Sequence, residues 1–323
     1  MSNILTKMKQ FNSLIQLLDT FKTDAICREY LAEQRWPAGV ACVHCGNMKV
    51  YTTTRKKKDG EVVKEYKCAA KECHKKFSVT VGTIFENTNI GLRHWFAAVY
   101  LATAHKKGIS SLQLSRDLNI TQKTAWFMLH RIRESMREKA PQVLDGMVEM
   151  DETYIGGKRS NKPLKERKRL AELRTADDKT PVFGMKDRDG KIIAMSVDAV
   201  TANELYPIIN ASVEKGTTII TDGHPIYKKL ANADNRYTHE SVDHSKDEYV
   251  RGDFHTNGIE GFWSMLKRGI IGIYHQVSVK HLDRYCDEFA YRANTNKVPD
   301  SVRFTQSLAR VEGRLTYADL IKK

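Results

Sequence analysis

Three acidic side chains, far apart in the sequence, occupy positions from which one fold could bring them together. Asp151 lies in GMVEMDETYIGG, Asp222 ends the buried-strand pattern TTIITDG, and Glu260 lies in the helix-forming segment HTNGIEGFWSMLKRG. Three carboxylates at one place would repel one another unless divalent cations neutralised them. Two Mg²⁺ (or Mn²⁺) ions about 4 Å apart would activate an attacking oxygen and stabilise the leaving oxygen in phosphoryl transfer.

Neighbouring polar side chains compete for the same role. Because side chains alternate along a strand, Glu149 shares a face with Asp151, whereas Glu152 lies on the other face. Asn257 could supply a further oxygen ligand in place of, or beside, Glu260. The sequence leaves the share of Asn257 and Glu260 in metal binding open.

The cysteines indicate a second metal site. Four of the six form two short-loop pairs: Cys42, Cys45, Cys68 and Cys73. Without a secretory signal, clustered cysteines favour metal binding over disulfides. Two such pairs predict one structural Zn²⁺ in a zinc ribbon, with every coordination position filled by protein. His44 or His74 could replace one cysteine.

The hydrophobic pattern predicts the elements that must position these groups. From about residue 146 it predicts a strand, a hairpin, a helix, a strand and a later helix, the succession of an α/β ribonuclease-H-like fold. That fold would bring the middle of its first strand, the end of its fourth strand and a late helix together. The chain is thus predicted to be multidomain, with these parts: helical segment 1–36, zinc ribbon 37–90, helix-turn-helix-like segment 91–140, catalytic domain 146–300 with a basic insertion at 158–180, and C-terminal tail 301–323.

The charge of the chain indicates its partner. The formal net charge is +14 and the isoelectric point about 9.4, and a protein this basic usually meets a polyanion, for which nucleic acid is the default. A membrane partner is disfavoured, because no run of about 18 apolar residues and no lipidation motif occur. The expected location is the cytoplasm, associated with the nucleoid.

Basic and polar side chains suggest where DNA would lie. In the helix-turn-helix-like segment, Gln122 and Lys123 begin the last helix and Arg131 follows on another face, so these three are candidate DNA contacts; an ordinary helical connector is the alternative. Lys267 follows Glu260 by about two helical turns, so both project from one face. Lys267, with the adjacent Arg268, could hold a DNA phosphate or be a surface lysine.

With these residues assembled, the chain resembles prokaryotic insertion-sequence transposases that carry an N-terminal zinc ribbon and a DDE catalytic domain, the ISXO-two-like group. The similar stretches, which span nearly the whole chain, are RWPAGVACVHCG, MDETYIGGK, TDGHPIY, HTNGIEGFWSMLKRGIIGIYHQVS and HLDRYCDEFAYRAN. The resemblance implies that the catalytic triad is Asp151, Asp222 and Glu260, with Lys267 as the trailing lysine.

The resemblance also implies a reaction and its partners. Two Mg²⁺ ions would serve hydrolysis at the element's end, which frees a 3′-OH that then attacks target DNA. The zinc ribbon and the helical segment would recognise the terminal inverted repeats of double-stranded DNA, and the basic insertion would be a mobile loop that touches DNA. Because two ends must be held at once, a homodimer or larger assembly is expected.

Three other functions compete with this interpretation. One is a DNA-binding regulator, with a zinc ribbon and helix-turn-helix on an inactive ribonuclease-H-like domain; retention of all three carboxylates argues against it. Another is a nuclease that hydrolyses DNA without strand transfer, which the sequence does not separate from a transposase. A basic structural protein would leave the ordered acidic residues unexplained.

Overall fold

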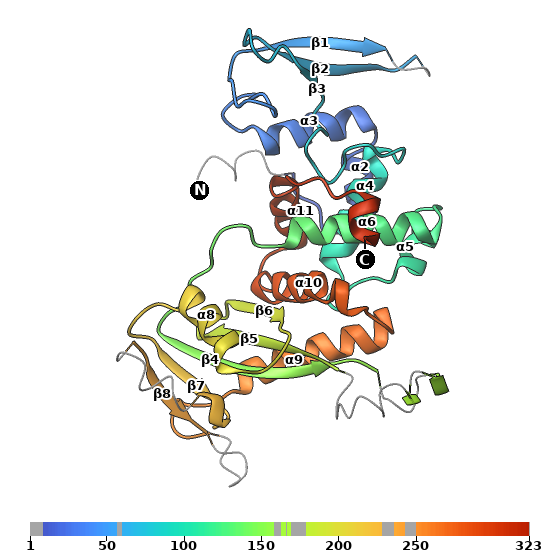
Figure 1. Cartoon of the computed structure of the whole chain (residues 1–323). Helices are drawn as coiled ribbons and strands as arrows, with labels where there is room; N and C mark the ends of the chain where they lie inside the picture. The colour runs from blue at the N-terminus through green and yellow to red at the C-terminus, as the bar shows by residue number, and fades with distance from the viewer. Residues whose placement is uncertain are drawn as a thin grey trace. The chain divides into compact units, whose positions relative to one another are not determined.

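The chain folds into two compact units (Figure 1). The computed structural model describes residues 9–56, 60–157, 163–165, 167–168, 179–227, 236–242 and 250–322. Unit 1 combines residues 1–136 with 297–323, and unit 2 comprises residues 137–296. Most of the predicted basic insertion at 158–180 lies outside the described residues, including 158–162 and 169–178.

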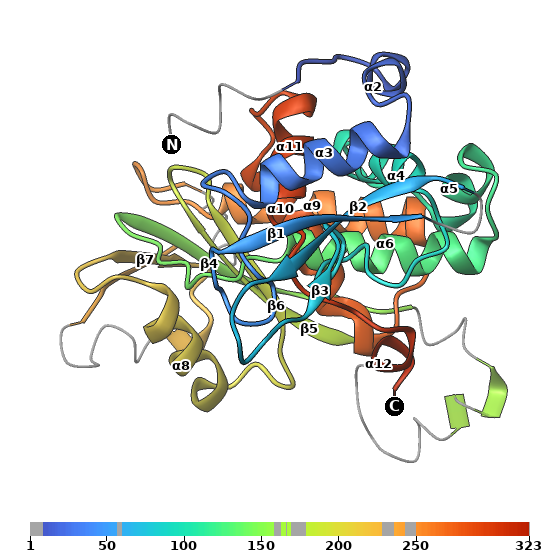
Figure 2. The same cartoon turned by 90° about the horizontal axis from the view of Figure 1, so that it is seen from above.

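Unit 1 contains a small antiparallel sheet of three strands in the order β1-β2-β3. Its strands are β1 (Val50–Lys56), β2 (Val62–Cys68) and β3 (Lys76–Phe77). Tyr66 and Phe77 stack at a ring-centroid distance of 5.5 Å, and both are buried with Cys42 and Cys68. Figure 2 shows β1 and β2 side by side as a long hairpin. The core of this sheet is small, so a metal is expected to supply much of its stability.

The rest of unit 1 is helical. Its helices are α2 (Leu14–Thr20), α3 (Asp24–Arg35), α4 (Leu92–Ala104), α5 (Ser111–Asp117), α6 (Gln122–Met136), α11 (Asp300–Ala309) and α12 (Tyr317–Ile321). Phe21, Tyr30, Phe96 and Phe304 form an aromatic core, and the Tyr30 hydroxyl lies 2.9 Å from the Thr305 hydroxyl. Residues 301–323, which the sequence predicts as a tail, therefore contribute two helices to this unit.

Unit 2 is built on a five-stranded mixed sheet in the order β6-β5-β4-β7-β8. The strands are β4 (Met147–Ile155), β5 (Thr180–Asp187), β6 (Ile192–Ser196), β7 (Thr218–Thr221) and β8 (Thr238–Ser241). The first three pair antiparallel, whereas β7 pairs parallel with β4, and β8 pairs parallel with β7. The central strand β4 thus lies between an antiparallel and a parallel neighbour.

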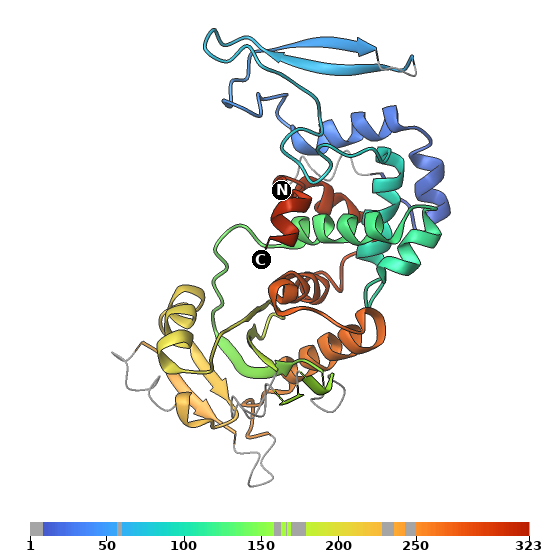
Figure 3. The same ribbon diagram turned by 45° about the vertical axis from the view of Figure 1, so that its right-hand side comes forward.

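Helices cover both faces of this sheet (Figure 3). They are α8 (Ala202–Ser212), α9 (Asn257–Gly269) and α10 (Leu282–Asn294); a π-helix (Ile270–Tyr274) and a 3-10 helix (Val279–His281) lie between α9 and α10. On one face Val148 and Met150 pack with Leu205 of α8, and on the other face Val182 packs with Phe262 of α9. Alternate residues of β4 therefore face α8 and α9. No helix within the described ranges has the length and apolar character needed to cross a membrane.

Candidate functional site

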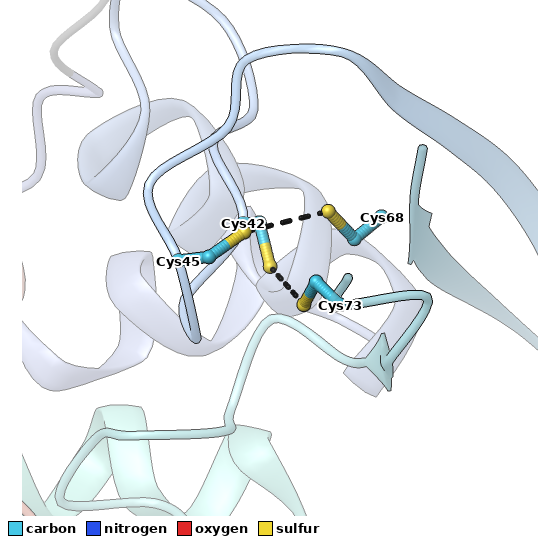
Figure 4. Close-up of side chains that lie close together, drawn as sticks. All are labelled: Cys42, Cys45, Cys68 and Cys73. Atoms are coloured by element: carbon cyan, nitrogen blue, oxygen red, sulfur yellow. Dashed lines mark hydrogen bonds between the residues drawn. The ribbon is translucent and has the colours of Figure 1, made fainter. Parts of the chain in front are cut away.

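Four cysteine sulfurs converge beside the small sheet of unit 1 (Figure 4). The Sγ atoms of Cys42 and Cys73 are 3.8 Å apart, those of Cys45 and Cys68 are 3.5 Å apart, and all four lie within 4.8 Å of one another. Such spacing fits four thiolates around one tetrahedral Zn²⁺, with Zn–S bonds of about 2.3 Å. The four cysteines are therefore the candidate ligand set, and His44 and His74 lie outside this group of possible ligands.

The local backbone positions these thiols in two knuckle-like turns. The N–H of His44 donates to the Cys42 sulfur, and the N–H of Ala70 donates to the Cys68 sulfur, both at 3.4 Å. Gly46 adopts φ 76° and His74 adopts φ 45°, so each turn contains a left-handed residue that reverses the chain. Hydrogen bonds to sulfur stabilise the negative thiolates that zinc requires.

The β4–β7 register directs Asp222 toward Asp151 in unit 2. The last pair in the parallel β4–β7 ladder is Glu149 with Ile220, and Asp222 directly follows the end of β7 at Thr221. Continued by two residues, this register would set Asp222 opposite Asp151. Burial raises the pKa of Asp151 to about 7, and the charges of Glu152 and Asp222 raise this pKa as well. Without a cation, the Asp151 carboxyl therefore holds its proton up to near-neutral pH, and a bound cation would displace that proton.

Helix α9 packs over Asp151 and carries the third acidic residue. The indole nitrogen of Trp263 donates to Asp151 Oδ2 at 2.9 Å, and the Thr256 hydroxyl donates to Glu260 Oε1 at 2.8 Å. Among the residues that the structure describes, only the four cysteines form a group of three or more possible ligands within 4.8 Å of one another. Glu260 therefore lies on the helix that covers Asp151 but does not join the two aspartates at that distance.

The remaining carboxylates of β4 have different partners. Glu152 lies on the α8 face, where the buried Tyr227 donates to it at 2.6 Å, and burial raises the pKa of Glu152. Glu149 lies on the α9 face, where its Oε2 accepts from the N–H of Ile259 at 2.8 Å. The alternation that the sequence predicts for Glu149, Asp151 and Glu152 is thus present in the structure.

Comparisons with known proteins match both units. Residues 143–294 match the family model of the ISXO2-like transposase domain, and residues 22–76 match that of the transposase zinc-ribbon domain. The "Uncharacterized protein in transposable element ISH50" of Halobacterium salinarum is 30% identical over 291 residues, which cover 87% of this chain and 95% of that relative. The chain belongs to the ISXO2-like insertion-sequence transposases.

One solved structure also aligns with this transposase. It is a chain of the "CryoEM structure of simian T-cell lymphotropic virus intasome in complex with PP2A regulatory subunit B56 gamma", with 12% identity and a TM-score of 0.28. The alignment covers 55% of the transposase and 63% of that chain. A likeness this weak carries no argument about the fold.

The predicted DNA contacts of the transposase differ in exposure. Gln122, Lys123, Lys267 and Arg268 are exposed. Arg131 is not a surface contact: it is 3% exposed, and its guanidinium donates to the carbonyl oxygens of Leu315 and Glu86 at 3.1 and 2.6 Å. The helical spacing of Arg131 within α6 does not predict these partners, because both come from other segments of unit 1.

Proposed function

We propose that the transposase binds the terminal inverted repeats of its element, cuts DNA at the element's ends and joins the freed 3′-OH to target DNA. The observation that supports this proposal is the β4–β7 register, which directs Asp222 toward Asp151, together with α9, the helix that carries Glu260 and is bonded to Asp151 through Trp263. The strand order, with β4 central between an antiparallel hairpin and two parallel strands, supports a ribonuclease-H-like fold.

The donor set at this edge of the sheet fits a hard cation. Asp151, Asp222 and Glu260 offer carboxylate oxygens, the ligands that Mg²⁺ and Mn²⁺ prefer. Two such ions, when bound, would supply Lewis acidity at the attacking and leaving oxygens. In this proposal the sheet directs the two aspartates to the site, and the exposed Glu260 side chain of α9 completes the set when the cations bind.

In the proposed reaction no covalent bond forms between protein and DNA. In the first step a water oxygen attacks the phosphorus at the element's end, the bond to the 3′ oxygen breaks, and that oxygen takes up a proton to become a 3′-OH. In the second step this 3′ oxygen loses its proton and attacks a target phosphodiester, whose own 3′ oxygen leaves. The protein holds both DNA strands in line and stabilises charge on the phosphoryl group.

Unit 1 supplies the DNA-recognition surface in this proposal. Helices α5 and α6 are joined by a short turn at Asn119, which has φ 51°, and this arrangement supports a helix-turn-helix module. Gln122 and Lys123 lie exposed at the start of α6, where a recognition helix contacts DNA. Because two element ends must be held together for joining, we propose a dimer or larger assembly on DNA.

A combined cleavage and strand-transfer assay tests the proposal. The purified transposase, DNA from both flanks of its own gene and Mg²⁺ are expected to yield joined products that are absent with Glu260→Ala. Cleavage without joining would instead indicate a nuclease. Binding without cleavage, by wild type and variant alike, would indicate a DNA-binding regulator.

Lys267→Ala is expected to weaken DNA binding evenly across sequences and to reduce the slope of log K against log salt by about 1, because one phosphate contact is lost. Fluorescence anisotropy over a range of salt concentrations measures this slope. Lys215→Ala, which removes the same charge from an exposed loop position of unit 2, is the control. Equal slopes for wild type and Lys267→Ala would make Lys267 an ordinary surface lysine.

A further inference from the structure

Two side chains on the same face of β4 are each hydrogen-bonded to α9. The carboxylate of Glu149 accepts from the backbone N–H of Ile259 at 2.8 Å, and that of Asp151 accepts from the indole N–H of Trp263 at 2.9 Å. Glu149 is fully buried, with 0% of the residue exposed. The two bonds thus connect positions two residues apart in the strand to positions four residues apart in the helix.

These two spacings match in length. Two residues of a strand rise about 6.7 Å, and four residues of an α-helix rise about 6 Å. Four residues make slightly more than one helical turn, so the Trp263 side chain lies about one turn beyond the Ile259 N–H, and only the first turn of a helix has N–H groups without an intrahelical partner. The two bonds together therefore favour one register of α9 along β4.

Two glycines allow the helix to approach this closely. Gly184 of β5 lies opposite Asp151, and a Cβ there would overlap the Trp263 ring. A Cβ at Gly258, in the first turn of α9, would meet the Lys186 ammonium and come within 2.8 Å of the Glu149 carboxylate. A side chain at Gly184 would displace the Trp263 ring, and one at Gly258 would displace the Lys186 ammonium and crowd the Glu149 carboxylate.

Glu149 caps the N-terminus of α9. The residue that precedes α9, Thr256, makes no side-chain bond to the helix backbone, and its hydroxyl donates to Glu260 instead. The first N–H groups of a helix have no partner inside the helix, so the Ile259 amide depends on Glu149. The negative carboxylate is also favourable at the positive end of the helix dipole.

Two further side chains contact Glu149 Oε1. The Arg188 guanidinium pairs with this oxygen and donates to the carbonyl of Asp253 at 2.7 Å, so the segment before α9 is held as well. His255 Nδ1 lies 3.6 Å from the same oxygen. A buried carboxylate of this kind is stable because an opposite charge and a backbone N–H satisfy its two oxygens. Both oxygens of Glu149 are thereby occupied, which argues against a role for it as a cation ligand.

We propose that Glu149 and Trp263 form a two-point attachment that fixes the register of α9 on β4, and with it the placement of Glu260 and Lys267 relative to Asp151. Glu149 and Trp263 are positioning residues in this account. The functional part of the proposal rests on the proposed catalytic role of Asp151 and Glu260, whereas the attachment itself is a property of the protein without DNA.

Hydrogen exchange of the DNA-free transposase tests the attachment directly. In Glu149→Ala the Ile259 amide is expected to exchange about 10- to 100-fold faster than in wild type, the range for loss of a bond to a charged group. Glu149→Gln keeps an acceptor oxygen and is expected to restore part of the protection. Trp263→Phe keeps most of the ring but lacks the N–H, and is expected to speed exchange in the first turns of α9 while the protein stays folded.

The same variants are then assayed for cleavage. We expect Glu149→Ala and Trp263→Phe to lower the cleavage rate and to raise the Mg²⁺ concentration needed for half-maximal rate, with DNA affinity unchanged. Glu204→Ala is the matched control, because the Glu204 carboxylate likewise accepts from backbone N–H groups, those of Asp198 and Ala199 at 2.6 and 2.9 Å, but lies on α8. This control is expected to change neither the hydrogen-exchange rates in α9 nor the rate of DNA cleavage.

Two results would overturn the inference. One is a hydrogen-exchange rate of the Ile259 amide in Glu149→Ala that equals the wild-type rate. The other is a loss of DNA cleavage in both Glu149→Ala and Trp263→Phe while the hydrogen-exchange rates in α9 stay unchanged. A wild-type protein that cuts no DNA would count against the proposed function, and the exchange measurement would still decide whether the attachment exists.

Discussion

Replacing Asp151 with alanine is expected to slow cleavage of element-end DNA by about 10³-fold or more, because cation binding at the reacting phosphate is worth several kcal/mol. DNA affinity is expected to stay the same or rise, since a negative charge close to the DNA phosphates is removed. Asp222→Ala and Glu260→Ala are expected to behave alike. Single-turnover cleavage in Mg²⁺ measures the rate, and anisotropy measures the affinity.

Asp145→Ala is the matched control for these variants. It removes one negative charge from an exposed position just before β4, outside the candidate site. We expect it to keep wild-type cleavage. Full cleavage activity in any one of the three site variants would show that the replaced residue is not part of the site. If Glu260→Ala stays active and Asn257→Ala loses cleavage activity, the third cation ligand is Asn257.

Removal of zinc is expected to unfold the small sheet of unit 1 and to abolish DNA binding. Structural zinc contributes about 10–16 kcal/mol of apparent binding free energy to small metal-dependent folds, and the core around Tyr66 and Phe77 is too small to replace it. Metal analysis is expected to find one structural zinc per chain in the wild type and none in Cys68→Ala. Hydrogen exchange is expected to show lost protection in β2 with α4 and α6 still protected.

His44→Gln is the control for the zinc site, since His44 is exposed and lies between two ligands but outside the set of four sulfurs. It is expected to retain one zinc and wild-type DNA affinity. A protected β2 in metal-free protein would contradict the zinc-dependent fold, and zinc loss in His44→Gln would contradict the four-cysteine ligand set.

The sequence predicted the cysteine cluster of the zinc ribbon and the main elements of unit 2 because their signals are local. Two short-loop cysteine pairs lie in one segment, and the strand pattern ending in Asp222 is continuous along the chain. Local patterns do not set register between distant strands, and the pairing of Glu149 with Ile220, on which the approach of Asp151 to Asp222 depends, came only from the structure.

Long-range packing also explains the misassigned side chains. Arg131 has the helical phase of a surface residue, but Trp95 and Leu315 come from distant segments and enclose it. The spacing of Trp263 in the sequence predicts a core aromatic residue and does not predict its hydrogen bond to Asp151.

A change of metal specificity at Asp222 shows whether this aspartate holds the catalytic cation. Thiolate is a poor ligand for Mg²⁺ but binds softer cations, so Asp222→Cys is expected to cut element-end DNA slowly in Mg²⁺ and to regain activity in Mn²⁺. Asp222→Ala should remain inactive with either cation. Equal activity of Asp222→Cys in Mg²⁺ and Mn²⁺, at the wild-type rate, would show that Asp222 does not hold the catalytic cation and would contradict the account.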